Sequence, residues 1–203
     1  VSAGTTIRIS FTSSLALTGN PTVTITPGIL PGMSEQEISQ LPTYTAIFDS
    51  RSGNDYTYTF LILSSHPSGT ARISVTGQSQ SCQGTSITGT SIIGTFNIDN
   101  LPPTTTIACG GVAATAGGCT GLLLAPLTVT LACADNSGGS GCNRVCYSVS
   151  GPQPLAERCI AGATAGFTLG AGTHTVSYYS IDNANNRGVT RTQTITVYNP
   201  NDV

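Results

Sequence analysis

The sequence lacks lysine and tryptophan altogether, contains a single methionine, and gives only 8% of its 203 residues to charged side chains. Its seven basic residues are therefore all arginine, and the formal net charge is -2. A nucleic-acid backbone is neutralised by clustered basic side chains, so we expect no nucleic-acid partner. Binding to an anionic membrane surface is not expected for the same reason.

Long apolar runs are also missing. No stretch approaches the roughly 20 apolar residues that a membrane-spanning helix needs. The chain opens at Val1 without the charged and apolar segments of a signal peptide. We therefore expect no membrane insertion, and we expect that any export signal has been removed.

The sequence does contain many short segments in which apolar and polar residues alternate, as in a strand with one buried face. In residues 173–181 (T-H-T-V-S-Y-Y-S-I), His174, Val176 and Tyr178 share one face, and a turn of Asp, Asn and Gly follows. One helical turn is predicted after Ser34, which forms a capping box with Glu37. Further strands are predicted at residues 5–12, 21–26, 44–48, 56–63, 71–75, 91–98, 127–133, 143–150 and 189–197.

These strands are separated by turns rich in Gly, Pro, Asn and Asp, including one at residues 49–55, and no helical period is sustained. The pattern predicts an all-β protein made of two tandem immunoglobulin-like β-sandwich domains. The phrase F-N-I-D-N-L-P-P-T at residues 96–104 marks the linker, because consecutive prolines cannot continue a strand ladder. The predicted domains are residues 1–100 and a disulfide-rich domain of residues 101–203.

Six of the seven cysteines lie within residues 109–159. Such density indicates an oxidising, extracellular setting. A cytosolic zinc site is the alternative, but the paired cysteine spacing of zinc knuckles is missing and the two histidines lie in different halves. Sequence alone does not decide the pairing. Loop proximity favours three short loops and leaves Cys82 over: Cys109 with Cys119, Cys133 with Cys142, and Cys146 with Cys159.

Residues 102–198 resemble bacterial immunoglobulin-like repeats, including the chitobiase C-terminal-like type. The resemblance is carried by P-P-T-T at the start, D-N-S-G-G-S-G-C at 135–142, Y-S-V-S-G-P-Q-P at 147–154, and G-T-H-T-V-S-Y-Y-S-I-D-N-A-N-N at 172–186. In that family the last turn reads D-x-A-G-N, whereas here Asn185 replaces the glycine, and the Y-x-x-D-G-S-x-P turn lacks its Asp.

The first half is similar to the same superfamily only through residues 70–77 and the closing F-N-I-D. The resemblance implies tandem sandwiches of the kind found in secreted surface proteins, adhesins, fibres and multi-domain hydrolases. It implies no single activity.

Two acidic turns are candidates for a calcium site. Asp135, Asp182 and Asn183 fall in turns that could meet at one end of the second sandwich. Calcium takes six to eight oxygen ligands, roughly, and two carboxylates are few for it. The alternative is that these residues only cap their turns through side-chain to backbone hydrogen bonds. No other cofactor is expected.

No catalytic residue is predicted, and we expect no enzyme. His66 and His174 lie in no nucleophile motif, and they are expected to serve a turn and a strand surface respectively. Glu35 and Glu37 stand two residues apart, which does not suit a paired glycosidase mechanism.

Four tyrosines are candidates for stacking on a surface glycan: Tyr56, Tyr58, Tyr178 and Tyr179. Tyr56 and Tyr58 share a strand face, whereas Tyr178 and Tyr179 do not. Without tryptophan such a platform is weak, and the alternative is tyrosines at sandwich edges with their hydroxyls in water.

Two functional hypotheses follow. The favoured one is a non-enzymatic extracellular structural protein, the building block of a cell-surface fibre, filament or adhesin that self-assembles through strand edges. Its donated strand would be residues 5–12, in which Ile7, Ile9 and Phe11 alternate, although the same pattern suits an ordinary first strand. The rival is a carbohydrate-binding or spacer module of a larger secreted hydrolase.

Overall fold

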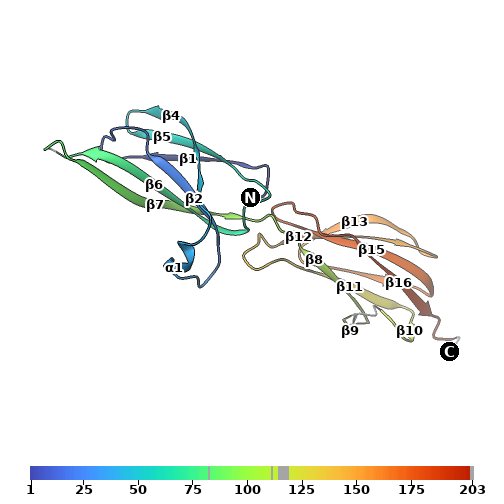
Figure 1. Ribbon diagram of the computed structural model, residues 1–203. Coiled ribbons are helices and arrows are strands. Elements are labelled where there is room, and N and C mark those ends of the chain that lie inside the picture. The colour runs from blue at the N-terminus through green and yellow to red at the C-terminus, as the bar shows by residue number, and fades with distance from the viewer. Residues whose placement is uncertain (82, 111, 114–118, 202–203) are drawn as a thin grey trace. The chain divides into compact units, whose positions relative to one another are not determined.

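The computed structural model describes residues 1–81, 83–110, 112–113 and 119–201 and divides into two compact units, each built of strands (Figure 1). Unit 1 comprises Val1–Asn100 with Ser137–Gly139, and unit 2 comprises Leu101–Asn136 with Ser140–Val203. The division falls just before the two prolines of the linker. The part of the chain that the structure describes holds no helix long and apolar enough to cross a membrane. Cys82 lies outside the described residues.

Unit 1 is a sandwich of two antiparallel sheets (Figure 1). The first sheet has the order β1-β5-β4 and the second has the order β3-β2-β6-β7. The first consists of β1 (Thr6–Thr12), β5 (Asp55–Leu61) and β4 (Ile47–Ser52). The second consists of β3 (Tyr44–Thr45), β2 (Thr22–Ile29), β6 (Gly69–Gln80) and β7 (Ser86–Ile98).

Alternation along these strands builds the core of unit 1. Tyr56, Tyr58 and Phe60 of β5 point inward, and they meet apolar side chains of β2 and β6 such as Ile25 and Ala71. The helix α1 (Glu35–Ile38) is a single turn with the expected capping box, in which Ser34 and Glu37 bond reciprocally. It buries Ile38.

Unit 2 is a second sandwich. One sheet has the order β14-β11-β8-β9, and the other has the order β10-β16-β15-β12-β13. The first consists of β14 (Thr164–Leu169), β11 (Leu127–Ala134), β8 (Thr104–Cys109) and β9 (Val112–Ala113). The second consists of β10 (Leu123–Leu124), β16 (Arg191–Tyr198), β15 (Gly172–Asp182), β12 (Cys142–Ser150) and β13 (Leu155–Ala161).

Three disulfides reinforce unit 2: Cys109–Cys119, Cys133–Cys142 and Cys146–Cys159. They are the three pairs that loop proximity favoured in the sequence. Cys133 lies next to the last residue of β11 in one sheet and Cys142 begins β12 in the other, so this bridge joins the two sheets. Cys146 and Cys159 stand directly opposite each other on β12 and β13.

The strand order identifies both units as immunoglobulin-like. In that fold the first, second and fifth principal strands share a sheet, while the third, sixth and seventh form the other. In unit 2, β8, β11 and β14 take the first set of places and β12, β15 and β16 the second. The protein is therefore an all-β chain of two tandem immunoglobulin-like β-sandwiches, as the sequence predicted.

One predicted turn is wrong. Residues 49–55 were expected to form a turn, but residues 47–52 form β4, and the chain reverses only at Gly53 and Asn54. Every side chain of β4 is exposed, so its sequence has no alternation of apolar and polar residues from which a strand could be predicted. Backbone pairing with β5 maintains it instead.

Candidate functional site

His66 is part of the core of unit 1. Its ring stacks on Phe60 at 5.1 Å between centroids and lies 4.3 Å from the ring of Tyr44. The backbone N–H of Leu63 donates to its Nδ1 at 3.1 Å. Burial lowers the pKa of His66, so the ring is neutral and held as an acceptor near neutral pH. It serves a turn, as expected.

His174 is fully buried in unit 2, and the expectation of a strand-surface role is wrong. It faces inward from β15 with Val176 and Tyr178, and its Nε2 lies 3.0 Å from the carbonyl oxygen of Gly170. The ring therefore stabilises the turn between β14 and β15. Among the described residues neither histidine has a serine or threonine hydroxyl as a partner, so neither is arranged as the base of a nucleophile.

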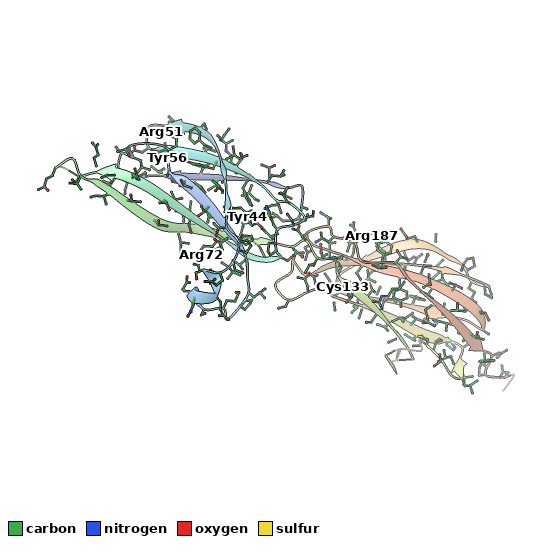
Figure 2. The ribbon with its side chains drawn as sticks, in the orientation of Figure 1. Tyr44, Arg51, Tyr56, Arg72, Cys133 and Arg187 are labelled. Atoms are coloured by element: carbon green, nitrogen blue, oxygen red, sulfur yellow. A yellow bond between two sulfur atoms is a disulfide. The ribbon has the colours of Figure 1, made fainter. Side chains whose placement is uncertain are left out.

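The two glutamates of α1 are engaged in structural contacts. Arg72, labelled in Figure 2, donates two hydrogen bonds to Glu35 at 2.7 and 2.8 Å, and this contact lowers the pKa of Glu35. The backbone N–H and the hydroxyl of Ser34 both donate to Glu37 at 2.7 Å and lower its pKa. Both carboxyls are therefore ionised at neutral pH, and neither suits a general acid.

The tyrosines do not form a sugar platform. Tyr56 and Tyr58 are only 1% and 2% exposed, and Tyr178 and Tyr179 are buried as well. The Tyr58 hydroxyl donates to the carbonyl oxygen of Pro21, and Arg51 lies 4.9 Å from the centre of the Tyr56 ring (Figure 2). The stacking hypothesis and the edge position with hydroxyls in water are both wrong for these residues, because alternation turns Tyr56 and Tyr58 toward the same core as Phe60.

The acidic turns of unit 2 do meet. Carboxylate oxygens of Asp135 and Asp182 lie within 4.8 Å of one another, and Asp182 is fully buried. Asp135 accepts backbone hydrogen bonds from Asn136 at 2.9 Å and Gly141 at 2.6 Å. Asp182 accepts two from Asn186, both at 2.8 Å.

Asn183 ties these turns together. Its side-chain amide donates to the carbonyl oxygens of Ser140 and Gly141 at 2.9 and 3.0 Å, and its side-chain oxygen accepts from Asn143 at 3.2 Å. The contacts are those of turn capping. Calcium binding at Asp135, Asp182 and Asn183 stays a prediction.

The segment expected to be donated to a neighbouring subunit pairs within its own chain. Residues 6–12 pair as β1 with β5 of the same chain, in register from Thr6 opposite Leu61 to Thr12 opposite Asp55. Ile9 is buried in the core of unit 1, with Ile7 and Phe11 packed against it. Donation of this strand is therefore wrong, since its removal would open the unit's own sheet.

The other side of β1 is open. Among the strands that the structure describes, β1 has a neighbour only in β5, so it forms an edge of its sheet. A groove of about 330 Å³ lies between the end of β1 with its following loop and the inner face of the β6–β7 hairpin. It is lined by uncharged residues, which include Phe11, Leu15, Leu17, Val75, Ile87 and Ile93. This groove offers a partner a mainly apolar recess in unit 1.

The comparisons give structural similarity only. No protein-family model and no curated protein matches the sequence. Fibronectin(III)-like modules of Clostridium thermocellum CbhA match at 16% identity and TM-score 0.36, over 98% of this chain and 89% of that one. A tetra-tandem repeat from the extending region of a large adhesion protein matches at 15% identity and TM-score 0.35, over 96% of this chain and 46% of that one.

A DUF4785 family protein of Legionella pneumophila matches at 9% identity and TM-score 0.39, over 97% of this chain and 54% of that one. This chain therefore spans about half of the last two proteins. The fold assignment rests on the strand order of the two units.

Proposed function

We propose that this chain is a non-enzymatic structural module of an extracellular fibre, filament or adhesin. The observation that carries the proposal is that the side chains able to do chemistry are engaged in the fold. His66 and His174 are buried, Glu35 and Glu37 are tied to Arg72 and Ser34, and the four candidate tyrosines are buried. What the units offer to a partner is strand edge and uncharged surface.

The disulfides support an extracellular location. All three lie in unit 2, and each closes a short loop, with separations of 10, 9 and 13 residues. Small exported domains use such bridges where a modest core alone is marginal, and reducing compartments do not maintain them. The scarcity of charge fits a surface that meets neutral polymers or other copies of the chain rather than a charged ligand.

The test is the state of the native material. Protein recovered from intact cells should be protected from a thiol-alkylating reagent at the six cysteines of unit 2, accessible to external protease, and present in particles larger than one chain. Sedimentation and electron microscopy measure the last property. A cytosolic, reduced monomer would overturn the proposal.

A spacer within a larger secreted protein is the second candidate. It is favoured by the pairing of β1 inside its own sheet, because each unit then folds without a neighbour's strand. The spacer function predicts an oxidised, extracellular chain that sediments as a monomer at every concentration. The two candidates therefore share the compartment and differ in assembly.

A further inference from the structure

The two units differ at one place in the same fold. In unit 2, β11 is flanked by β14 on one side and by β8 on the other. In unit 1, β1 takes the place of β11: the strand after each lies in the opposite sheet, and β5 pairs with β1 as β14 pairs with β11. No strand described in unit 1 takes the place of β8. Among its described residues, unit 1 therefore holds no counterpart of the first strand of the fold.

The open edge of β1 presents backbone N–H and C=O groups that a further strand could bond. Ser13 donates its backbone N–H to Asn54, and Thr5 accepts from Ile62, so the odd-numbered residues of β1 bond toward β5. Bonding alternates along an antiparallel strand. The remaining residues therefore direct their N–H and C=O groups to the open edge: Thr6, Arg8, Ser10 and Thr12.

This edge has none of the usual protection against pairing. Edge strands are normally blunted by bulges, proline, clustered charge or short length. Within the described part of unit 1, β4 has a register shift and carries Asp49 and Arg51, β7 runs against a register shift, and β3 has two residues. In contrast, β1 runs in continuous register over seven residues with Arg8 as its one charge.

The groove beside this edge needs a cover. Ile87 and Ile93 of β7 line it and are 54% and 40% exposed, and Leu15 is 63% exposed. In unit 2, the corresponding space is closed by β8 (T-T-T-I-A-C), which is uncharged and buries Thr105, Ile107 and Cys109 at alternate positions. A strand of this type beside β1 would pair its backbone and cover the apolar floor with every second side chain.

We infer that unit 1 is a strand acceptor: its open β1 edge and apolar groove bind an extended, uncharged segment of another polypeptide, with apolar or threonine side chains at alternate positions. The uncharged lining excludes an acidic or basic peptide, because such a side chain would lose its hydration without gaining a partner. The inference deepens the proposed function, on which its biological meaning rests. It replaces strand donation by β1 with strand acceptance at β1.

The probe is a fluorescent synthetic peptide with the sequence of residues 102–109 and serine in place of Cys109. The 203-residue protein is titrated with it, and anisotropy reports binding while amide chemical shifts report the site. We expect saturable binding with shifts along β1 and the inner face of β7, and no binding by a scrambled peptide. Two N-methylated peptides, blocked at complementary alternate amides, should behave oppositely, because one edge of the peptide faces β1.

Two protein variants localise the site. Gly89 lines the groove, and a Cβ added there would meet no atom within 4 Å, so Gly89→Phe is chosen to fill the groove. This variant should bind the peptide with an affinity at least about tenfold lower than that of the wild type. Thr88→Phe is the matched control, because residue 88 points to the opposite face of β7, and it should bind like the wild type. Ser10→Pro removes one outward N–H and should also weaken binding.

Each result is decisive. No peptide binding, or binding that Gly89→Phe leaves unchanged, overturns the inference. A wild-type protein that dimerises, while Ser10→Pro stays monomeric and no peptide binds, assigns the edge to a second copy instead and also overturns it. If the chain binds the peptide but stays monomeric on the cell surface, the strand-acceptor inference is supported and only the proposal of a filament is overturned.

Discussion

Asp182 and Asn186 are joined by two hydrogen bonds, one from the backbone N–H and one from the side-chain amide of Asn186, both 2.8 Å long. They close the turn after β15. Within it, Asn185 has a φ of 67°, in the left-handed region. The conformation explains why asparagine is accepted at this position: among non-glycine residues it tolerates this region best.

The turn gives a test at one residue. Asn185→Gly should leave the unfolding free energy of unit 2 unchanged or slightly higher, whereas Asn185→Val should lower it by about 1–2 kcal/mol, because a branched side chain is strained at positive φ. Urea denaturation followed by tyrosine fluorescence measures both. Asn54→Val, at a turn residue without positive φ, is the control and should cost less.

His66 should make unit 1 sensitive to mild acid. Burial lowers its pKa below the ordinary value of 6.5. Above pH 6.5 the ring is neutral in the folded and the unfolded chain, so its contribution is complete. As the pH falls below 6.5, the unfolded chain takes up the proton first, and the stability of unit 1 declines until the folded pKa is passed.

Imidazole resonances in an NMR titration report this pKa directly. A His66 that titrates at or above 6.5 would contradict the prediction. The lowered pKa values of Glu35 and Glu37 act in a separate window, since their stabilising contacts are complete above 4.5 and are lost only as the pH falls further.

The disulfides should make unit 2 the more resistant half. On heating without reductant, amides of residues 1–100 should exchange before those of residues 101–201. The double variant Cys133→Ala with Cys142→Ala should lower the unfolding free energy of unit 2 by about 2–3 kcal/mol, the chain-entropy value for so short a loop. Unit 1 is the internal control and should be unaffected. Simultaneous exchange of both halves would show that the units unfold together.

Tyr56 and Tyr58 form a matched pair for a test of the buried hydroxyls. The Tyr58 hydroxyl donates to Pro21, whereas that of Tyr56 has no hydrogen-bond partner among the described residues. Tyr58→Phe should therefore cost about 1–2 kcal/mol and Tyr56→Phe close to nothing. If the protein bound a glycan and either variant lost this binding while keeping its fold, the rejection of the glycan-stacking hypothesis would be wrong.

Much of the fold could be predicted, because burial on one face imprints alternation on the sequence. The hairpin of β15 and β16 shows it: His174, Val176 and Tyr178 share a face in the pattern and in the core. The same pattern puts His174 on the face of Val176 and Tyr178, but the prediction of a strand-surface role overlooked it, because histidine is polar. The tyrosines of β5 alternate with Phe60 in the same way and could have been assigned to the core.

Several of the missed strand segments share one cause. β4, most of β13 and the outer half of β7 have exposed side chains, so they form by backbone pairing and leave no apolar pattern. The open edge of β1 could not be predicted from the sequence pattern at all. It depends on which strands lie beside β1 among the described residues, and nothing in residues 5–12 distinguishes a strand with two neighbours from a strand with one.

The three short disulfide loops also determine how unit 2 would behave under tension. A pulling force passes from one cysteine to its partner through the sulfur atoms, so the residues between them carry no load and add nothing to the extended length. An unfolded unit 2 would therefore stretch less far than its residue count suggests. Reduction would release this hidden length, so that the redox state of the surroundings sets the reach of the chain.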